Sequence, residues 1–226
     1  MLLSFTRAFY RIKLELFNKH PVFKLLNSCW RSQKSKKNAH WKDCDYLVVD
    51  LEMTSLDVRT GEILSIGWVI IRKGIILLDS AEHHIIHSNQ SVGQSATIHQ
   101  LRDCEVEQGL SITEISARFL EVAVNKTLVF HHAPLDTAFL DKASRAIYGA
   151  PLLLQVIDTL NLEKIKLMKH QEHIKQGELR LAACRDRYNL PLYPAHNALM
   201  DALATAELLL AIANHKGEDT TLRDLL

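Results

Sequence analysis

The chain has 226 residues, of which 47% are hydrophobic and 23% are charged, a balance typical of a globular protein with a buried core. Eight glycines and five prolines exclude a collagen-like or low-complexity chain. Charged residues interrupt every apolar run before 18 residues, so no membrane-spanning helix is predicted. The four cysteines are widely spaced and form no CxxC pair, which argues against a zinc or thioredoxin-like site. Nothing signals secretion, so a cytoplasmic location is expected.

The net charge of +1 conceals an uneven distribution of charge along the chain. Residues 1–42 contain ten Lys and Arg residues and one acid, whereas residues 43–226 contain 17 bases and 25 acids. We therefore predict a basic head (residues 1–42), made of an amphipathic extension and a linker. It precedes an acidic body (residues 43–226), which we expect to be a single domain.

The basic head is predicted to begin with a helix. Its apolar residues recur at spacings of three and four, which places them on one helical face: Leu2, Phe5, Phe9, Ile12 and Leu16. Pro21 interrupts this pattern, and the polar run at 31–37 (RSQKSKK) reads as a flexible linker. Three interpretations stay open: a helix that packs on the body or on a second subunit, a nucleic-acid arm, or an amphipathic helix at a membrane surface.

The acidic body is predicted to be an α/β domain. Apolar, β-favouring runs at 46–49, 63–71 and 75–78, the last extending toward 86, predict an antiparallel meander. The later pattern predicts helices at 113–124, with Thr113 as N-cap, and at 134–148, 178–188 and 198–214. Short strands are expected at 128–130 and 152–157. This order predicts a mixed sheet with flanking helices.

Four acids occupy positions where an α/β fold forms sites. Asp50 and Glu52 end the first strand, and their i, i+2 spacing directs both side chains to one side. Asp136 and Asp201 lie in the first turns of two helices. Four carboxylates gathered at one sheet edge need a cation between them, and hard oxygen ligands suit Mg²⁺ or Mn²⁺. Two ions about 3.5–4 Å apart would clamp a phosphodiester. Asp136 by itself would also suit a favourable interaction with the helix dipole.

His196 precedes Asp201 by five residues, in the loop that enters the last long helix. An unperturbed imidazole titrates near pH 6.5, which suits a general base at neutral pH. We expect His196 to take the proton from an attacking water molecule.

Three segments together resemble the motifs of the DEDDh 3′–5′ exonucleases, the relatives of the bacterial polymerase proofreading subunit and of oligoribonuclease. The first is 50–57 (DLEMTSLD), the second is 129–136 (VFHHAPLD), and the third runs from His196 to Asp201, a His followed by four residues and an Asp. The resemblance covers residues 44–214 in the family's order and spacing. It departs from the family at His132, where Asn is usual, and at Leu135, where an aromatic residue is usual.

The resemblance implies an RNase H-like fold and hydrolysis of single-stranded DNA or short RNA from the 3′ end, with release of nucleoside 5′-monophosphates. It implies two Mg²⁺ or Mn²⁺ ions, held by Asp50, Glu52, Asp136 and Asp201, and a general base at His196. It also implies contacts with the terminal nucleotide or the strand being degraded from Met53, Thr54, Leu56 and His99.

Two further expectations concern partners and turnover. The apolar face of the basic head makes a homodimer or a polymerase-type partner plausible through residues 1–42. The alternative to an exonuclease is a catalytically weak module of the same fold that binds nucleic acid or a protein partner.

Overall fold

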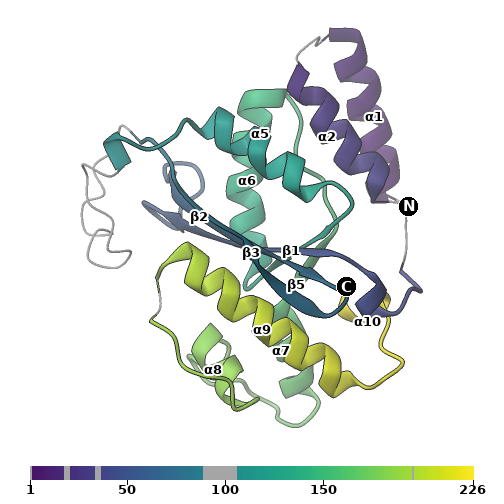
Figure 1. The fold of residues 1–226 in the computed structure, drawn as a ribbon, viewed down its shortest axis with the longest axis vertical. Coiled ribbons are helices and arrows are strands. Elements are labelled where there is room, and N and C mark those ends of the chain that lie inside the picture. The colour runs from purple at the N-terminus through teal and green to yellow at the C-terminus, as the bar shows by residue number, and fades with distance from the viewer. Residues whose placement is uncertain (1, 18–20, 34–36, 89–105, 195) are drawn as a thin grey trace.

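The computed structural model describes residues 2–17, 21–33, 37–88, 106–194 and 196–226. They form a five-stranded sheet between two layers of helices (Figure 1). The strands are β1 (Tyr46–Met53), β2 (Ile63–Arg72), β3 (Ile75–Ile85), β4 (Thr127–Phe130) and β5 (Val156–Asp158). The helices of the body are α5 (Ile112–Ala123), α6 (Ala133–Tyr148), α7 (Thr159–Met168), α8 (Leu181–Asp186), α9 (Ala198–Lys216) and α10 (Leu222–Leu225).

The sheet has the order β3-β2-β1-β4-β5. β1, β2 and β3 pair antiparallel, whereas β4 pairs parallel to β1 and β5 parallel to β4. The turn between β2 and β3 contains Lys73 and Gly74, both at positive φ, as a tight hairpin requires. The predicted meander and mixed sheet are therefore confirmed.

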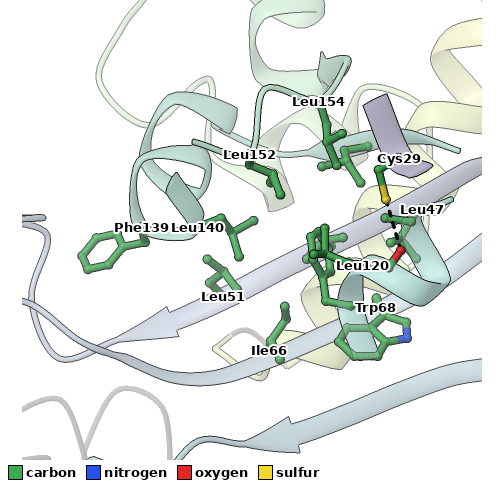
Figure 2. Close-up of a cluster of buried hydrophobic side chains, with 14 of the residues drawn as sticks. Cys29, Leu47, Leu51, Ile66, Trp68, Leu120, Phe139, Leu140, Leu152 and Leu154 are labelled. Carbon is green, nitrogen blue, oxygen red and sulfur yellow. Dashed lines mark hydrogen bonds between the residues drawn. The ribbon is translucent and has the colours of Figure 1, made fainter. Parts of the chain in front are cut away.

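Side chains of β1 alternate between the two faces of the sheet. Leu47, Val49 and Leu51 join the core under α5 and α6, whereas Tyr46 and Val48 join the core under α9. Figure 2 shows Leu47 and Leu51 in the first of these cores, which also includes Trp68 and Phe139. Because the period is two residues, Asp50 and Glu52 fall on the α9 face of the sheet.

The basic head begins with α1 (Leu2–Phe17) and α2 (Pro21–Ser32), which lie beyond α5 (Figure 1). Leu26 and Cys29 of α2 are fully buried in the core under α5 and α6, where the Cys29 thiol donates to the carbonyl oxygen of Leu120 at 3.2 Å (Figure 2). The apolar stripe of α1, in contrast, faces solvent at Phe5 and Phe9. Packing on the body thus uses α2 and the other face of α1, which the expected amphipathic pattern did not indicate.

Three predicted boundaries were wrong. The cap of α5 is Ser111, which forms a capping box with Glu114, so Thr113 lies inside the helix. The helix expected at 178–188 is only α8, within 181–186. The strand expected at 152–157 begins only at Val156. The Leu152 carbonyl accepts from the Trp30 indole at 2.6 Å rather than from a neighbouring strand, and Leu153 has φ +48°, which is outside the extended region.

Helix α9 spans 19 residues, and within the described part of the chain it alone is long and apolar enough for a membrane span by length and composition. Half of that window is buried, and the helix packs along β1 and β2. This is the position of a core helix.

Candidate metal centre

Three of the predicted acids meet at one point on the α9 face of the sheet. Carboxylate oxygens of Asp50, Glu52 and Asp201 lie within 4.8 Å of one another. The first two come from the end of β1, and the third comes from the first turn of α9. No other group of three His, Cys, Asp or Glu side chains in the described residues is close enough to share an ion. The sequence predicted that the end of the first strand and the start of the last long helix bring these acids together, and this geometry agrees with that prediction.

Asp136 lies outside this tight group, but its charge acts on Asp50 and the charge of Glu52 acts on it. It lies in the first turn of α6, on the opposite side of the sheet from α9, and is 5% exposed. Its carboxylate accepts from its own backbone N–H and from that of Leu51, which ties it to β1 beside Asp50. Burial, together with the charges of Asp158 and Glu52, raises the pKa of Asp136 to about 8, although the two N–H groups act in the opposite direction.

The pKa values of Asp50 and Asp201 are raised for the same reasons as that of Asp136. Burial raises the pKa of Asp50 well above its usual value, and the charges of Asp136, Asp201 and Glu52 add to this effect. Burial also raises the pKa of Asp201, against the stabilising N–H of His196. A cluster of buried and half-buried carboxylates that repel one another is the arrangement that a divalent cation relieves.

His196 is held beside Asp201 through its backbone. Its N–H donates to Asp201 Oδ2 at 2.8 Å, and its φ of +70° is a left-handed conformation in which the exposed residue stands at the rim of the cluster. Asn197 caps α9 by accepting from the N–H of Met200 at 3.1 Å. The loop residues His196 and Asn197 therefore determine where α9 begins and where the histidine lies.

The predicted substrate-contact residues begin where β1 ends. Thr54 closes the loop 54–62, because its N–H donates to the Glu62 carbonyl and its hydroxyl accepts from the Glu62 N–H, both at 3.0 Å. Met53 is half-buried, and Leu56 is 75% exposed within that loop. His99 lies outside the described residues.

Two further residues organise the site. Asp158, which ends β5, accepts from the N–H of His132 and from that of Leu160, both at 3.0 Å, and so links the starts of α6 and α7. Gly67 pairs with Asp50 across the sheet, and a Cβ on Gly67 would overlap the backbone of Ala198 and Leu199. The sequence signal for Gly67 was a glycine inside an apolar strand, which marks a close backbone approach.

Replacing Gly67 by alanine should loosen the centre. The added methyl group would push the start of α9 away from β2, which moves Asp201 from Asp50. We expect Gly67→Ala to lower the free energy of unfolding by about 1–3 kcal/mol and the Mn²⁺ affinity about tenfold. Isothermal titration with Mn²⁺ and thermal unfolding measure the two effects. Gly217→Ala is the control for affinity: its Cβ would meet no atom within 4 Å, although its φ of +122° makes the substitution strained. It should lower stability without changing the Mn²⁺ affinity; a similar affinity loss there would contradict the role of Gly67.

The raised pKa of Asp136 predicts a pH-dependent stability. Between about pH 4 and 8 the folded chain holds this proton more tightly than the unfolded chain, so the free energy of unfolding should fall as pH rises through that window. In EDTA, Asp136→Asn should unfold at the same temperature as the parent protein at pH 4. At pH 8 it should be more stable, by on the order of 1 kcal/mol or more. Calorimetry at both pH values tests this, and an equal difference at pH 4 and pH 8 would refute it. The exposed Asp219→Asn serves as control.

Comparisons with known proteins match this chain to exonuclease domains. The family model described as an exonuclease (RNase_T) matches residues 47–209. The PolC-type DNA polymerase III of Thermotoga petrophila is 29% identical over 174 residues, which cover 76% of this chain but only 12% of that polymerase. This chain therefore spans about an eighth of the length of that relative.

Solved structures share the fold. Cell-death related nuclease 4 (CRN-4) superposes with a TM-score of 0.65 at 13% identity, covering 78% of this chain and 66% of CRN-4. E. coli Exonuclease I in complex with a dT13 oligonucleotide gives 0.64 at 12% identity, covering 75% of this chain and 41% of Exonuclease I. The mixed sheet with its flanking helices is thus the RNase H-like fold of these nucleases. Since the family model spans well over half of the sequence, the chain belongs to the RNase_T exonuclease family.

Proposed function

We propose that this chain is a metal-dependent 3′–5′ exonuclease of the DEDDh type. It hydrolyses phosphodiester bonds at the 3′ end of single-stranded DNA or short RNA and releases nucleoside 5′-monophosphates. The observation that carries this proposal is the cluster of Asp50, Glu52 and Asp201, whose oxygens lie within 4.8 Å of one another at the edge of an exonuclease-family sheet.

The residues of the cluster fit divalent cations. All the donors are carboxylates, the hard ligands that Mg²⁺ and Mn²⁺ prefer, and their raised pKa values show how costly their negative charge is without a counter-ion. Asp50, Glu52 and Asp201 would hold one ion, and Asp50 together with Asp136 would hold the second. When bound, such ions supply an activated water molecule and offset the charge of the scissile phosphodiester.

His196 is assigned as the general base. Its backbone bond to Asp201 holds it beside the cluster, while its side chain lies at the exposed rim, where an attacking water would be within its reach. The imidazole would accept the proton of that water as the phosphodiester bond breaks.

The loop 54–62 is assigned to the terminal nucleotide. Thr54 and Glu62 hold its two ends together, and Leu56 presents an apolar side chain to solvent within it. An exposed apolar side chain suits the face of an unstacked base. Met53 would contact the same nucleotide, and His99 would contact the strand.

The substrate range rests on the resemblance and on the relatives. Exonuclease I is solved with a single-stranded oligonucleotide, and the PolC-type relative is a DNA polymerase. A polymerase-type partner and a homodimer are the alternatives that the sequence leaves open for residues 1–42.

A digestion assay tests the proposed activity. With Mg²⁺ or Mn²⁺, the protein should shorten 5′-labelled DNA and RNA oligonucleotides one nucleotide at a time from the 3′ end, and EDTA should stop the reaction. Matched DNA and RNA strands of several lengths resolve the substrate preference. Oligonucleotides that bind but stay intact with both metals would instead favour the catalytically weak binding module.

A further inference from the structure

The helices α1 and α2 present a surface that the proposed catalytic centre does not use. They form the outer edge of the molecule on the side of α5 (Figure 1). Helix α2 turns Leu26, Cys29 and Trp30 into the core, each at most 5% exposed. Its outward positions include Lys24 and Arg31, both exposed.

The orientation of α1 is set by polar contacts with the body. Arg7 Nε donates to the Leu153 carbonyl at 2.8 Å, and Arg7 Nη2 donates to Gln33 Oε1 at 2.8 Å. Tyr10 packs against the core, and its hydroxyl accepts from Arg145 Nη1 at 3.3 Å. The face of α1 that carries Arg7 and Tyr10 is therefore the inner face.

The outer face of α1 is an apolar stripe. Phe5, Phe9 and Ile12 are 70%, 63% and 61% exposed, and their spacing of four and three residues places them in one row along the helix. Single exposed apolar residues are ordinary, but a row of large ones marks an interaction surface.

The charge of the segment that carries the stripe indicates which kind of partner covers it. The basic head carries ten bases and one acid, and Lys24 and Arg31 lie on the outward face of the adjoining α2. A second copy would set one cationic head against another, which disfavours a homodimer through this face. Single-stranded nucleic acid would satisfy the cations and would stack bases on Phe5 and Phe9, but it offers no continuous apolar layer for the aliphatic Ile12 in the same row. An anionic lipid surface satisfies both, because headgroups attract the cations and the acyl boundary accepts the stripe.

We propose that α1 and α2 bind the surface of an anionic lipid bilayer. Helix α1 lies in the plane of the interface, with Phe5, Phe9 and Ile12 in the acyl boundary, while Lys24 and Arg31 contact headgroups. The acidic body, with 25 acids to 17 bases, is repelled by the same surface and faces away from it. This inference does not depend on the catalytic assignment.

Sedimentation of the full chain with vesicles tests the proposal. The protein should bind vesicles of equal parts phosphatidylcholine and phosphatidylglycerol, should bind pure phosphatidylcholine far less, and should dissociate as NaCl is raised. Phe5→Ser with Phe9→Ser should weaken binding about tenfold or more. Lys24→Glu with Arg31→Glu should weaken it about 30-fold or more, since each lost cation accounts for about fivefold.

Two matched controls distinguish binding through this surface from non-specific binding by exposed apolar or cationic side chains. Ile75→Ser with Leu78→Ser removes two apolar side chains that are 63% and 67% exposed on β3. Lys169→Glu with Lys175→Glu reverses two exposed charges elsewhere on the body. Both doubles should bind the anionic vesicles as the parent protein does. Circular dichroism checks that each variant is folded.

Several outcomes would overturn the proposal. The parent protein staying in solution with anionic vesicles at low salt is one. A second is equal loss of binding in the head variants and their controls. A third is a dimer, seen by light scattering, that Phe5→Ser with Phe9→Ser abolishes while vesicle binding is unchanged; the stripe would then bind a second copy. A fourth is head-dependent binding to an oligonucleotide with none to vesicles, which would make the head a nucleic-acid arm.

Discussion

Asp50→Asn should lower the rate of oligonucleotide hydrolysis by at least about 10³-fold. Asp50 is the acid whose pKa is affected by all three of its carboxylate neighbours, and it is placed to serve both proposed ions. The substitution keeps the size of the side chain and removes its charge, so the loss would report ligand chemistry rather than packing. Single-turnover digestion of a 5′-labelled strand measures it.

Although Asp50→Asn should lose activity, it should gain stability in the absence of metal. Burial makes the Asp50 carboxylate costly to charge, so Asp50→Asn should raise the unfolding temperature in EDTA at pH 8. It should also reduce the stabilisation that Mn²⁺ confers on the parent protein. An inactive variant that retains the full Mn²⁺-induced shift would argue against Asp50 as a ligand.

Asp45→Asn is the matched control for Asp50. Asp45 lies just before β1 and pairs with Arg72 at 3.0 Å, with its side chain about one third exposed. Surface pairs of this kind contribute about 1 kcal/mol or less, so stability should change little. The rate of hydrolysis and the stabilisation by Mn²⁺ should both match those of the parent protein. Full activity in Asp50→Asn, in contrast, would refute the proposed centre.

His196→Asn should lower the rate constant of the chemical step by about 10²- to 10⁴-fold, the usual contribution of a general base. Asparagine tolerates the left-handed backbone that His196 adopts at φ +70°. It also keeps the N–H that donates to Asp201. Mn²⁺ affinity should therefore stay within about threefold of the parent value, since the ligands are undisturbed.

The control for His196 is His132→Asn, because His132 has the same type of backbone, with φ +82°, at the start of α6. Asparagine is the residue that the related second motif usually has there, and its N–H would still reach Asp158. This control should keep the parent rate within about twofold. The pH–rate profile provides the decisive comparison: only His196→Asn should lose the limb that reports deprotonation of the base. Unchanged turnover in His196→Asn would remove it from the mechanism.

Much of the site was predictable because its signals are local. The two-residue period of a strand determines that Asp50 and Glu52 share a face, and helix starts are readable at Asp136 and Asp201. The antiparallel pairing of β1, β2 and β3 follows from their short connections, whereas the position of β4 beside β1 was not predicted. The chain also departs from the expected strand at 152–157, where Trp30 and Arg7, distant in sequence, bind the backbone.

The sequence by itself determined the motif order, the mixed sheet and which acids could form a site, because periodicity and capping act within a few residues. Only the tertiary structure decided which of the acids meet. Gly67 admits α9 to the sheet, so that Asp201 joins Asp50 and Glu52, while Asp136 reaches β1 from the other layer. It also decided that the stripe of α1 faces solvent, because Arg7 and Tyr10 bind the body. Periodicity identifies an apolar face, but contacts between residues far apart in sequence decide what that face meets.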